Sequence, residues 1–577
     1  MNTADAMTDA APAAPPQDPP TGAEAVLALL CRHGVDTVFG YPGAAIMPLY
    51  DAMTRGDRVP RHLLHRHEQG AGFAASGYAR ATGRLGVCIA TSGPGATNLV
   101  TAVTDAHMDS VPMLVITGQV PTGLMGTDAF QETDVLGLSL GITKHGFLVR
   151  RVEDLVPVLQ EAIRLAREGR PGPVWVDIPK DVQQASLPGP LPPPEPPVTA
   201  SPGLDTPGQE ALERARALLR GARRPVLYAG GGVVAAGAVE ALRAFVDVTE
   251  IPAVTTLRGL GLLPPGHPRD LGMLGMHGSP CANRAVQDSD LLVVVGARFD
   301  DRATGRLAGF APGARIIHLD GDPAEVSKLR AAEVGLLGDL NRLLPALAIP
   351  LEIAPWREAC ATARATRGHG LPPLGADGAF PPLHFLRELS RRAGPGTRIA
   401  CDVGQHQMWV AQHYAFHHPR QHLTSSGLGA MGFGLPAAIG AQMADPGGRV
   451  IAISGDGSIL MNVQELATLR RYDLPVKVVV FDNAYLGMVR QQQALFCDGR
   501  LSEVDLSDNP DFTRVAEAFG IPARRFEGAG AVEDAVAACL ETPGPLLLHI
   551  PVAREQGVWP LVGPGLSNDQ MIEEDPA

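Results

Sequence analysis

Short apolar runs that end in polar turns recur along the chain, and two of them dominate the stretch from residue 449 to 490. Residues 450–454 (VIAIS) and 476–481 (VKVVVF) are rich in β-branched side chains and show no alternation of apolar and polar positions. This pattern is typical of strands buried on both faces. Between the two runs, residues 460–471 carry apolar side chains at helical spacing. The stretch therefore predicts a strand, helix, strand unit of a parallel sheet.

Each of these strands ends in a polar turn, made of Gly455, Asp456 and Gly457 after the first and of Asp482 and Asn483 after the second. In a parallel unit both turns lie at the carboxyl edge of the sheet, where open α/β sheets bind ligands. A single carboxylate with a carboxamide and a backbone carbonyl suits Mg²⁺, and glycines admit a bulky anion close to the backbone. The triplet alone would fit an ordinary turn, but the Asn on the next strand favours a site for Mg²⁺ and phosphate.

The same kind of pattern divides the rest of the chain into three α/β units. With 577 residues, the chain is too long for a single hydrophobic core. Apolar runs alternate with helical patterns in each unit, and a Pro-rich stretch separates the first two, so we expect three doubly wound parallel-sheet domains. The expected boundaries are a disordered tail 1–20, a first domain 21–185, a linker 186–205, a central domain 206–351, a looser linker 352–380, a third domain 381–552 and a polar C-terminal tail 553–577, which either forms a flap or frays.

The amino-acid composition limits which partners and which cellular compartment we expect for the protein. The net charge of -13 argues against nucleic acid and anionic membranes as partners. No apolar run approaches the roughly 18 residues of a membrane span, and no secretory leader pattern is present, so we expect a cytoplasmic protein. The seven Cys have no Cys-x-x-Cys spacing, and we expect them to be reduced core residues.

A second polar constellation lies in the first unit, where residues 65–72 read HRHEQGAG. Glu68 follows a short apolar run and opens a helix of small residues, which would let the helix pack closely against something flat. An acid at a helix N-terminus is also favourable without any other role. On the residues alone, the two interpretations stay open.

The turn Gly455-Asp456-Gly457, followed some two dozen residues later by Asn483, resembles the thiamine diphosphate motif. That resemblance implies that Asp456, Asn483 and the carbonyl of Tyr485 hold Mg²⁺, and that Glu68 hydrogen-bonds the aminopyrimidine ring of the cofactor. This chain has Asp482 where the family usually has a first Asn. The residues implied to contact thiamine diphosphate are Glu68, Val403, Gly404, Gln405, His406, Met431, Gly455, Asp456, Gly457, Ser458, Asn483, Tyr485, Leu486, Gly487 and Met488.

Further segments narrow the resemblance to the catalytic subunit of acetohydroxyacid synthase, also called acetolactate synthase. They are YPGAAIMPLYDAM (41–53), TSGPGATNLVT (91–101), GTDAFQETD (126–134), ITKH (142–145), PGPVWVDIPKDVQ (171–183), LGMLGMHG (271–278), GARFDDR (296–302), DVGQHQMW (402–409) and GLGAMGFGLPAAIGA (427–441). The family decarboxylates pyruvate and joins the hydroxyethyl carbanion held on thiamine diphosphate to a second 2-keto acid. The products are 2-acetolactate or 2-aceto-2-hydroxybutanoate, in valine, leucine and isoleucine synthesis.

The resemblance also implies the domain roles and the assembly. The first domain would bind the pyrimidine, the central domain FAD and the third domain the diphosphate with Mg²⁺. Because the family places the pyrimidine and diphosphate sites on different subunits, a homodimer is the smallest working assembly and a homotetramer is an alternative. A small regulatory subunit is a further partner that the family implies.

Several residues receive roles in the reaction from this resemblance. Arg302 would hold the carboxylate of the second keto acid in its guanidinium fork, although a salt bridge to Asp300 or Asp301 is an alternative. Met431 would bend the cofactor, although a Met between glycines also serves as core filler. The residues implied to lie around the reacting atoms are Glu68, Phe130, Gln131, Lys180, Met276, Arg302 and Gln492.

The central domain raises the question of a second cofactor. Gly230, Gly231 and Gly232 follow one strand and Asp320 follows another, as in a nucleotide-binding crevice. The glycines do not form a complete GxGxxG, so the FAD expectation depends on the family resemblance of residues 296–302, which implies a structural flavin. The residues implied to contact FAD are Gly230, Gly231, Gly232, Thr256, Leu257, Met276, His277, Gly296, Arg298, Asp300, Arg302, Asp320 and Asp339.

One departure from the family pattern concerns specificity. The family usually has a Trp where this chain has Gln492, and one isozyme branch also has Gln there. Loss of a flat apolar wall predicts a weaker preference for 2-oxobutanoate over pyruvate as the second substrate.

Three alternative functions stay open from the sequence. An FAD-dependent pyruvate oxidase would share the fold but need an electron acceptor. A glyoxylate carboligase would lack the activating Glu, and a non-catalytic homologue would have lost residues such as Glu68 and Asp456, both of which are present.

Overall fold

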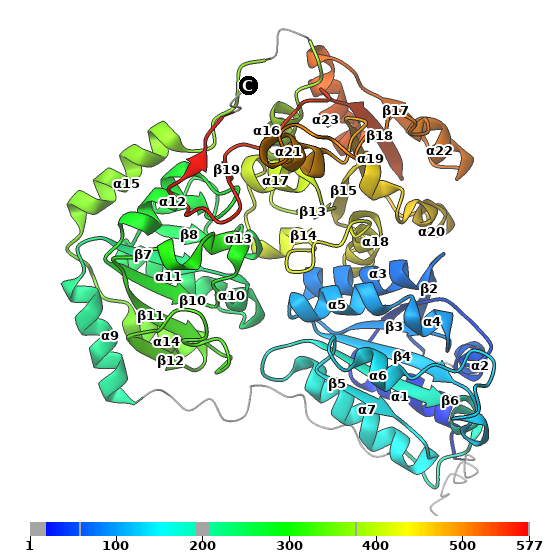
Figure 1. Cartoon of the computed structure of the whole chain (residues 1–577). Helices are drawn as coiled ribbons and strands as arrows, with labels where there is room; N and C mark the ends of the chain where they lie inside the picture. Colours follow the sequence, from blue (N-terminus) through cyan, green and yellow to red (C-terminus); the bar gives the residue numbers. More distant parts are fainter. Residues whose placement is uncertain (1–18, 57–58, 192–207, 375–377, 575–577) are drawn as a thin grey trace, which may run out of the picture.

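A computed structural model describes residues 19–56, 59–191, 208–374 and 378–574 (Figure 1). Three six-stranded sheets, each built from parallel strands, form three α/β domains, and a separate antiparallel pair lies near the C-terminus. The predicted fold class is confirmed. Among the described residues, no helix combines the length and the apolar character that a membrane crossing requires.

The first domain contains a sheet of order β2-β1-β3-β4-β6-β5. Every residue of β4 and β6 is buried, as expected for strands covered by helices on both faces. The strands are β1 (Thr37–Gly40), β2 (Arg61–Leu64), β3 (Gly86–Ala90), β4 (Met113–Gln119), β5 (His145–Leu148) and β6 (Pro173–Pro179). The helices are α1 (Gly22–Arg32), α2 (Met47–Arg55), α3 (Glu68–Thr82), α4 (Pro94–Thr97), α5 (Val100–Met108), α6 (Val135–Ser139), α7 (Val152–Arg167) and α8 (Lys180–Gln184).

The central domain has a different strand order, β12-β11-β10-β7-β8-β9. Counted within the domain this is the order 3-2-1-4-5-6 of dinucleotide-binding sheets, with the switch point between β7 and β10. The strands are β7 (Pro225–Ala229), β8 (Ala253–Thr255), β9 (Asp270–Met273), β10 (Leu291–Val295), β11 (Arg315–Asp320) and β12 (Val334–Leu337). The helices are α9 (Gln209–Gly221), α10 (Gly231–Ala235), α11 (Val239–Thr249), α12 (Pro280–Asp288), α13 (Asp301–Thr304), α14 (Leu340–Leu347) and α15 (Ala354–Arg367).

The third domain repeats the strand order of the first, as β14-β13-β15-β16-β18-β17. The first and third domains therefore share one topology. The strands are β13 (Thr397–Cys401), β14 (His422–Thr424), β15 (Arg449–Gly455), β16 (Lys477–Asp482), β17 (Ala523–Arg525) and β18 (Leu546–Pro551). The helices are α16 (Pro382–Ala393), α17 (Gln405–His413), α18 (Gly434–Ala444), α19 (Asp456–Ile459), α20 (Leu466–Tyr472), α21 (Gly487–Phe496), α22 (Phe512–Ala518) and α23 (Val532–Glu541).

Helices α3 and α18 join the first and third domains in one shared apolar core, where they face each other (Figure 1). Glycines allow this approach: a β-carbon on Gly77 would lie 2.2 Å from the Ala437 carbonyl oxygen, and one on Gly440 would lie 1.9 Å from that of Ala74. Since Glu68 is the first residue of α3, this packing ties its position to the third domain.

The helix predicted over residues 460–471 is only partly correct. In the structure α19 ends just before this stretch, which contains a 3-10 turn (Val463–Glu465) followed by α20. The break falls at Asn462, whose φ of -137° is not helical and whose side chain donates to the Gly432 carbonyl oxygen at 2.8 Å. A tertiary hydrogen bond thus overrides the local helical pattern.

The segments outside the domains differ from expectation where the structure describes them. Most of the expected tail 1–20 and of the linker 186–205 lies outside the described residues. The expected linker 352–380 contains α15, which belongs to the central domain's packing through the buried Cys360. The described chain contains no disulfide between its Cys residues, but Cys497 is exposed, so its assignment to the core is wrong.

In the C-terminal segment, expected to form a flap or to fray, residues 553–574 pack across the central and third domains (red in Figure 1). Trp409 and Gln412 of α17 donate to the carbonyl oxygens of Gly557 and Trp559. On the other side, the Val562 N–H donates to the Met276 carbonyl oxygen at 2.8 Å. The antiparallel pair β19 (Leu561–Val562) and β20 (Met571–Ile572) stabilises this strap.

Candidate functional site

The two polar turns predicted from the sequence meet at one edge of the third sheet. Strands β15 and β16 are adjacent and parallel, with Gly455 paired with Phe481, so the residues that follow each strand lie side by side. Asp456 is 3% exposed and Asn483 is 7% exposed. Two polar side chains are therefore held at this edge with little access to water.

A positive charge bound at this edge would stabilise the carboxylate of Asp456. Burial, followed by the nearby Asp482 carboxylate, raises the pKa of Asp456 to about 7. Asp482 has its own partner, because His549 of β18 lies 2.8 Å from its Oδ2. Burial would raise the pKa of Asp482, but the hydrogen bonds from His549 and from the Ala484 N–H together outweigh burial and lower it. The Asp at this position, which departs from the family pattern, is thus paired with a histidine of the neighbouring strand.

Amide side chains fix the orientation of Asn483. Its Nδ2 donates to Gln405 Oε1 at 3.1 Å, and Gln405 Nε2 lies 3.2 Å from Gln491 Oε1. Gln491 in turn pairs with the backbone of Val558 in the strap, through Nε2 to the carbonyl oxygen and Oε1 to the N–H. With Nδ2 engaged, Asn483 Oδ1 faces the other way, where it accepts the Tyr485 N–H at 3.2 Å and keeps a second lone pair for a ligand.

The donor set at this edge fits Mg²⁺ better than a transition metal. It consists of one carboxylate, one carboxamide oxygen and the Tyr485 carbonyl. No group of three or more His, Cys, Asp or Glu side chains suitable for a metal occurs in the described part of the chain. Oxygen donors of this kind suit a small, hard cation that shares its shell with phosphate and water.

Next to these donors the backbone forms a cradle for an anion. His406 at the start of α17 is buried, which lowers its pKa to about 3, and its Nε2 has no hydrogen-bond partner within the described residues. Gly404 has φ 148°, and a β-carbon on Gly455 would lie 2.9 Å from His406 Nδ1. A buried imidazole nitrogen without a partner, beside glycines and helix N-termini, fits a diphosphate.

The remaining predicted cofactor contacts gather around the same turn. A β-carbon on Gly457 would lie 2.8 Å from Leu486 and 3.7 Å from Met431 Cε, so these side chains converge. Ser458 donates to the Val403 carbonyl oxygen at 2.8 Å. Gly487 and Met488 open α21, which starts beside Asn483.

Glu68 lies on a different element, at the first turn of α3. It follows the cap residue His67, whose Nδ1 accepts the Gln69 N–H at 3.1 Å. Its Oε2 accepts a hydrogen bond from Asn98 at 3.0 Å, and the side chain is half-buried. The sequence predicted both the helix start and the acid at it.

A cavity of about 1280 Å³ lies where the three domains meet. Met276, His277 and Arg302 of the central domain line it together with Val403, Met488 and Gln492 of the third domain. Within the described chain, the cavity lining does not include Glu68, Phe130, Gln131 or Lys180. A single chain thus brings only part of the predicted reaction site together.

Arg302 extends toward this cavity without a strong ionic partner. Its Nε lies 3.7 Å from Asp301, both side chains are largely exposed, and its Nη1 lies 3.6 Å from Met276 Sδ. An exposed pair at this distance contributes little. The alternative that Arg302 serves only a structural salt bridge therefore has weak geometric support.

Three further predicted residues lie on the first domain. Gln131 adopts φ 64° and packs against Gly93. Its neighbour Phe130 is 87% exposed, and Lys180 is the first residue of α8 after β6. Phe130 and Gln131 thus lie in the turn between β4 and α6, outside the cavity described above.

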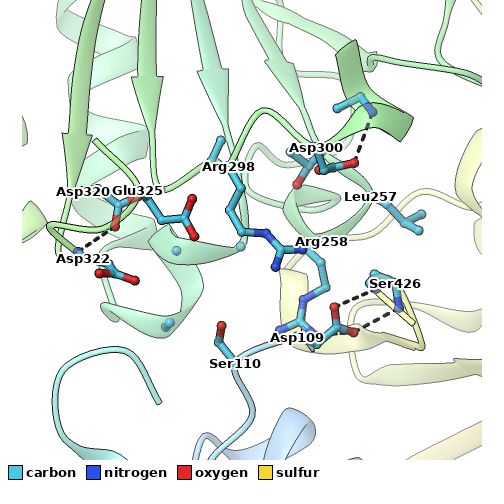
Figure 2. Close-up of a pocket in the computed structure, with 18 of the residues that line it drawn as sticks. Asp109, Ser110, Leu257, Arg258, Arg298, Asp300, Asp320, Asp322, Glu325 and Ser426 are labelled. Atoms are coloured by element: carbon cyan, nitrogen blue, oxygen red, sulfur yellow. Dashed lines mark hydrogen bonds and ion pairs between the residues drawn. The ribbon is translucent and has the colours of Figure 1, made fainter. Parts of the chain in front are cut away.

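The other end of the cavity is polar and belongs to the central domain (Figure 2). Arg258 and Arg298 extend into it, with Asp320 on one side and Asp300 on the other. Burial raises the pKa of Asp320, which ends β11, to about 6. The predicted residues that line this end are Gly231, Gly232, Thr256, Leu257, Gly296, Arg298, Asp300, Asp320 and Asp339.

Gly230 has another role. It does not line the cavity within the described chain, and a β-carbon there would lie 2.4 Å from the Gly296 carbonyl oxygen. The turn after β7 thus packs directly on the turn after β10. The size of the cavity and the strand order around it fit a dinucleotide.

Sequence reasoning missed a buried ionic cluster that borders this cavity. Asp109, labelled with Ser426 in Figure 2, accepts hydrogen bonds from the backbone N–H groups of Ser426 and Gly427, both at 3.0 Å. It also pairs with Arg80 at 2.8 Å. Arg258 lies 3.4 Å from the same carboxylate. These residues come from all three domains and lie far apart in the chain, so no local sequence pattern could have predicted the cluster.

Comparison with known proteins gives matches along most of the chain. Residues 20–138 match the N-terminal TPP binding domain of thiamine pyrophosphate enzymes, residues 212–347 their central domain, and residues 402–550 their C-terminal TPP binding domain. The acetolactate synthase isozyme 2 large subunit of Escherichia coli is 54% identical over 553 residues, which cover 96% of this chain and 99% of the relative. The acetolactate synthase large subunit of Parasynechococcus marenigrum is 47% identical, covering 96% and 91%, and the E. coli isozyme 1 large subunit is 44% identical, covering 96% and 98%.

Proposed function

The chain belongs to the acetolactate synthase large subunits, a family of thiamine pyrophosphate enzymes, and we propose on that premise how its residues carry out the reaction. It makes 2-acetolactate from pyruvate, in branched-chain amino acid synthesis. When bound, thiamine diphosphate supplies the carbon nucleophile and the electron sink for decarboxylation. The convergence of Met276 and Arg302 with Met488 and Gln492 on one cavity is the observation that carries the proposal.

Glu68 exchanges a proton with the aminopyrimidine ring nitrogen of the cofactor. The hydrogen bond from Asn98 to Oε2 supports this role, because it fixes the carboxylate, while Oε1 lies 3.5 Å from the place that a β-carbon on Gly95 would occupy. A carboxylate held at a helix start in a half-buried place is suited to move a proton.

Asp456, Asn483 and the Tyr485 carbonyl hold Mg²⁺, which neutralises the diphosphate. Three observations support this proposal: the raised pKa of Asp456 without a nearby cation, the fixed amide of Asn483 and the oxygen-only donor set. Gly404, Gln405, His406, Gly455 and Gly457 form the diphosphate cradle, and Val403, Met431, Ser458, Leu486, Gly487 and Met488 complete the contacts.

Arg302 holds the carboxylate of the second 2-keto acid, which is pyruvate or 2-oxobutanoate. A guanidinium offers two parallel hydrogen bonds to a carboxylate. Its loose, exposed contact with Asp301 supports this role. Met276 and Gln492 form the adjoining walls, and Phe130, Gln131 and Lys180 approach the same atoms from a second chain.

The site is complete only in an assembly of two chains. Glu68 and Gln131 do not line the cavity of Arg302 within the described part of one chain, so a partner copy must supply them. We infer a homodimer as the minimum, or a homotetramer. The names of the relatives, which are large subunits, support a small regulatory subunit as a further partner.

FAD occupies the polar end of the cavity in a structural role. The strand order of the central sheet and the cavity between the turns after β7 and β10 support a dinucleotide there. The residues that would hold it are Gly231, Gly232, Thr256, Leu257, Met276, His277, Gly296, Arg298, Asp300, Arg302, Asp320 and Asp339, with Gly230 setting the turn.

The test is a colour assay for acetoin after acid decarboxylation of the product. The purified protein receives pyruvate, Mg²⁺ and thiamine diphosphate, with and without FAD, and no electron acceptor. We expect acetolactate only with thiamine diphosphate, and less of it after removal of FAD. Product that forms only with an electron acceptor, as acetate or acetyl phosphate, would instead indicate a pyruvate oxidase.

A further inference from the structure

A buried carboxylate of the third domain reaches into the turn that leads to Glu68. Glu465 has a fully buried side chain, and its Oε2 lies 2.9 Å from Nδ1 of His65, which is also fully buried. Its Oε1 accepts the Arg66 backbone N–H at 3.0 Å, and the Thr468 hydroxyl donates to Oε2 at 2.6 Å. Two of these three bonds cross from the third domain to the first.

The same turn is held at two further points. The Leu64 N–H donates to the Tyr472 hydroxyl at 2.7 Å, and a β-carbon on Gly70 would lie 2.5 Å from Glu465 Oε1. Glu465 therefore lies against the backbone on both sides of Glu68, before it at Arg66 and after it at Gly70. A shift of this carboxylate would move the first turn of α3.

The charge of Glu465 is balanced within the site. Burial would raise its pKa, but His65, Thr468 and the Arg66 N–H outweigh burial, so the pKa is lowered and the group stays a carboxylate. Removing one partner of a buried pair leaves the other uncompensated and is strongly unfavourable. The contact is thus rigid, as a positioning element must be.

We propose that Glu465 is a positioning residue that sets the place of the Glu68 carboxylate, acting through His65, Arg66 and Gly70 without touching the cofactor. The proposal rests on the role given to Glu68 above. It predicts that changes at Glu465 impair the proton transfer that Glu68 performs, beyond any loss of fold stability. A carboxylate misplaced by about 1 Å costs roughly 100-fold in a positioned reaction.

The readout is the exchange of the C2 proton of bound thiamine diphosphate for deuterium, without substrate, followed by NMR after acid quench. Each variant is saturated with cofactor, and the affinity for thiamine diphosphate is measured separately by fluorescence quenching. Thermal unfolding of the cofactor-free protein records stability. The exchange rate measures proton removal from C2 directly, and a loss of fold stability alone would not slow it.

We expect Glu465→Ala to slow the exchange at least tenfold. Glu465→Gln keeps the acceptor for the Arg66 N–H and can donate to the other tautomer of His65, so we expect exchange within about threefold of the parent. If Glu465→Ala does not fold, Glu465→Asp carries the test, because it keeps the charge but withdraws from Arg66. Parental exchange in a folded Ala or Asp variant would overturn the proposal.

The matched control is Gln442→Ala in α18. Gln442 is also buried, and its Nε2 donates to three backbone carbonyl oxygens at 2.9 to 3.3 Å, so its loss lowers stability without contact to the Glu68 turn. Equal slowing in this variant would show a merely structural effect and overturn the proposal. Glu68→Gln separates the two claims: if it leaves exchange unchanged, the role of Glu68 fails, and if it slows exchange while the Glu465 variants do not, only the present inference fails.

Discussion

Replacing Arg80 by Met tests whether the ionic cluster between the domains stabilises the fold through charge balance. Arg80 lies in α3 with a side chain 4% exposed, and it pairs with Asp105 at 2.7 Å and Asp109 at 2.8 Å, which are 0% and 1% exposed. It also donates to the Thr424 carbonyl oxygen at 3.1 Å. Met fills a similar volume but leaves two buried carboxylates with too little positive charge.

The size of the effect follows from this burial. Breaking a buried ion pair by removing one partner costs about 3 to 5 kcal/mol, because the remaining charge is uncompensated. The double variant Arg80→Met/Asp105→Asn removes one of the two buried carboxylate charges that lose Arg80 as their partner. We therefore expect the double variant to recover at least about 1 kcal/mol of the free energy of unfolding, although it has lost one more native interaction.

The pH dependence supplies a second test with a definite sign. In the parent, burial raises the pKa of Asp105, whereas Arg80 and Arg258 outweigh burial at Asp109 and lower its pKa to about 2. The contribution of Asp109 is present above about pH 4 and is lost as pH falls toward 2. Without Arg80 both carboxyls should have raised pKa values, so the folded variant binds more protons than the unfolded chain and gains stability, relative to the parent, as pH falls from 7 to 5.

The assay is urea unfolding at several pH values, followed by the fluorescence of Trp175, which is fully buried in β6 of the first domain. The control is Arg84→Met, which removes an exposed ion pair with Asp36 near the same helix and should cost less than about 1 kcal/mol. If Arg80→Met costs no more than that control, or if the added Asp105→Asn deepens the loss, the reasoning from charge balance is refuted.

Four further outcomes follow from the site and the packing. Gln492→Trp should raise the ratio of 2-oxobutanoate to pyruvate as acceptor roughly fivefold, about 1 kcal/mol of apolar contact; an unchanged product ratio in a competition assay would contradict this. Arg302→Lys should raise KM for the acceptor about tenfold through loss of the carboxylate fork, with initial rates at varied acceptor as the measurement. Asp456→Asn should weaken Mg²⁺-dependent binding of thiamine diphosphate, measured by fluorescence titration. The loss should exceed the factor of about 10 to 100 that is typical when a residue supporting a metal ligand is changed. Gly440→Ala places a β-carbon 1.9 Å from a backbone carbonyl oxygen of α3, so it should lower the free energy of unfolding by about 1 to 3 kcal/mol or more. The control Gly447→Ala, where a β-carbon would have no neighbour within 4 Å, should not lower it.

The strands and turns of the site could be predicted because their signals are local. β15 and β16 are short, mostly apolar runs, and each begins and ends one residue from its predicted limits. Their parallel pairing follows from the intervening helical segment, and the pairing alone brings Asp456 close to Asn483. Glu68 was found for the same reason, since a helix start is encoded within a few residues.

Contacts between distant segments decided the rest. Glu465 lies 400 residues from His65 in the chain, and Asp109 lies 317 from Ser426, so neither pairing leaves a periodic or motif signal. Asn462 breaks a helix that its own segment favours, because its side chain finds a carbonyl on another loop. From its sequence the strap at the C-terminus is a polar tail. In the structure, side chains of α17 donate hydrogen bonds to its carbonyl groups and hold it in place.

The sequence by itself therefore determined the three α/β domains, the polar turns at the carboxyl edge of the third sheet and the acid that opens α3, because these depend on neighbours in the chain. Only the tertiary structure decided how the domains are fastened to one another and which charges are buried between them. The physical reason is that burial and ion pairing depend on distance in space, and apolar packing of α3 on α18 brings together groups whose separation along the chain carries no information about their contact.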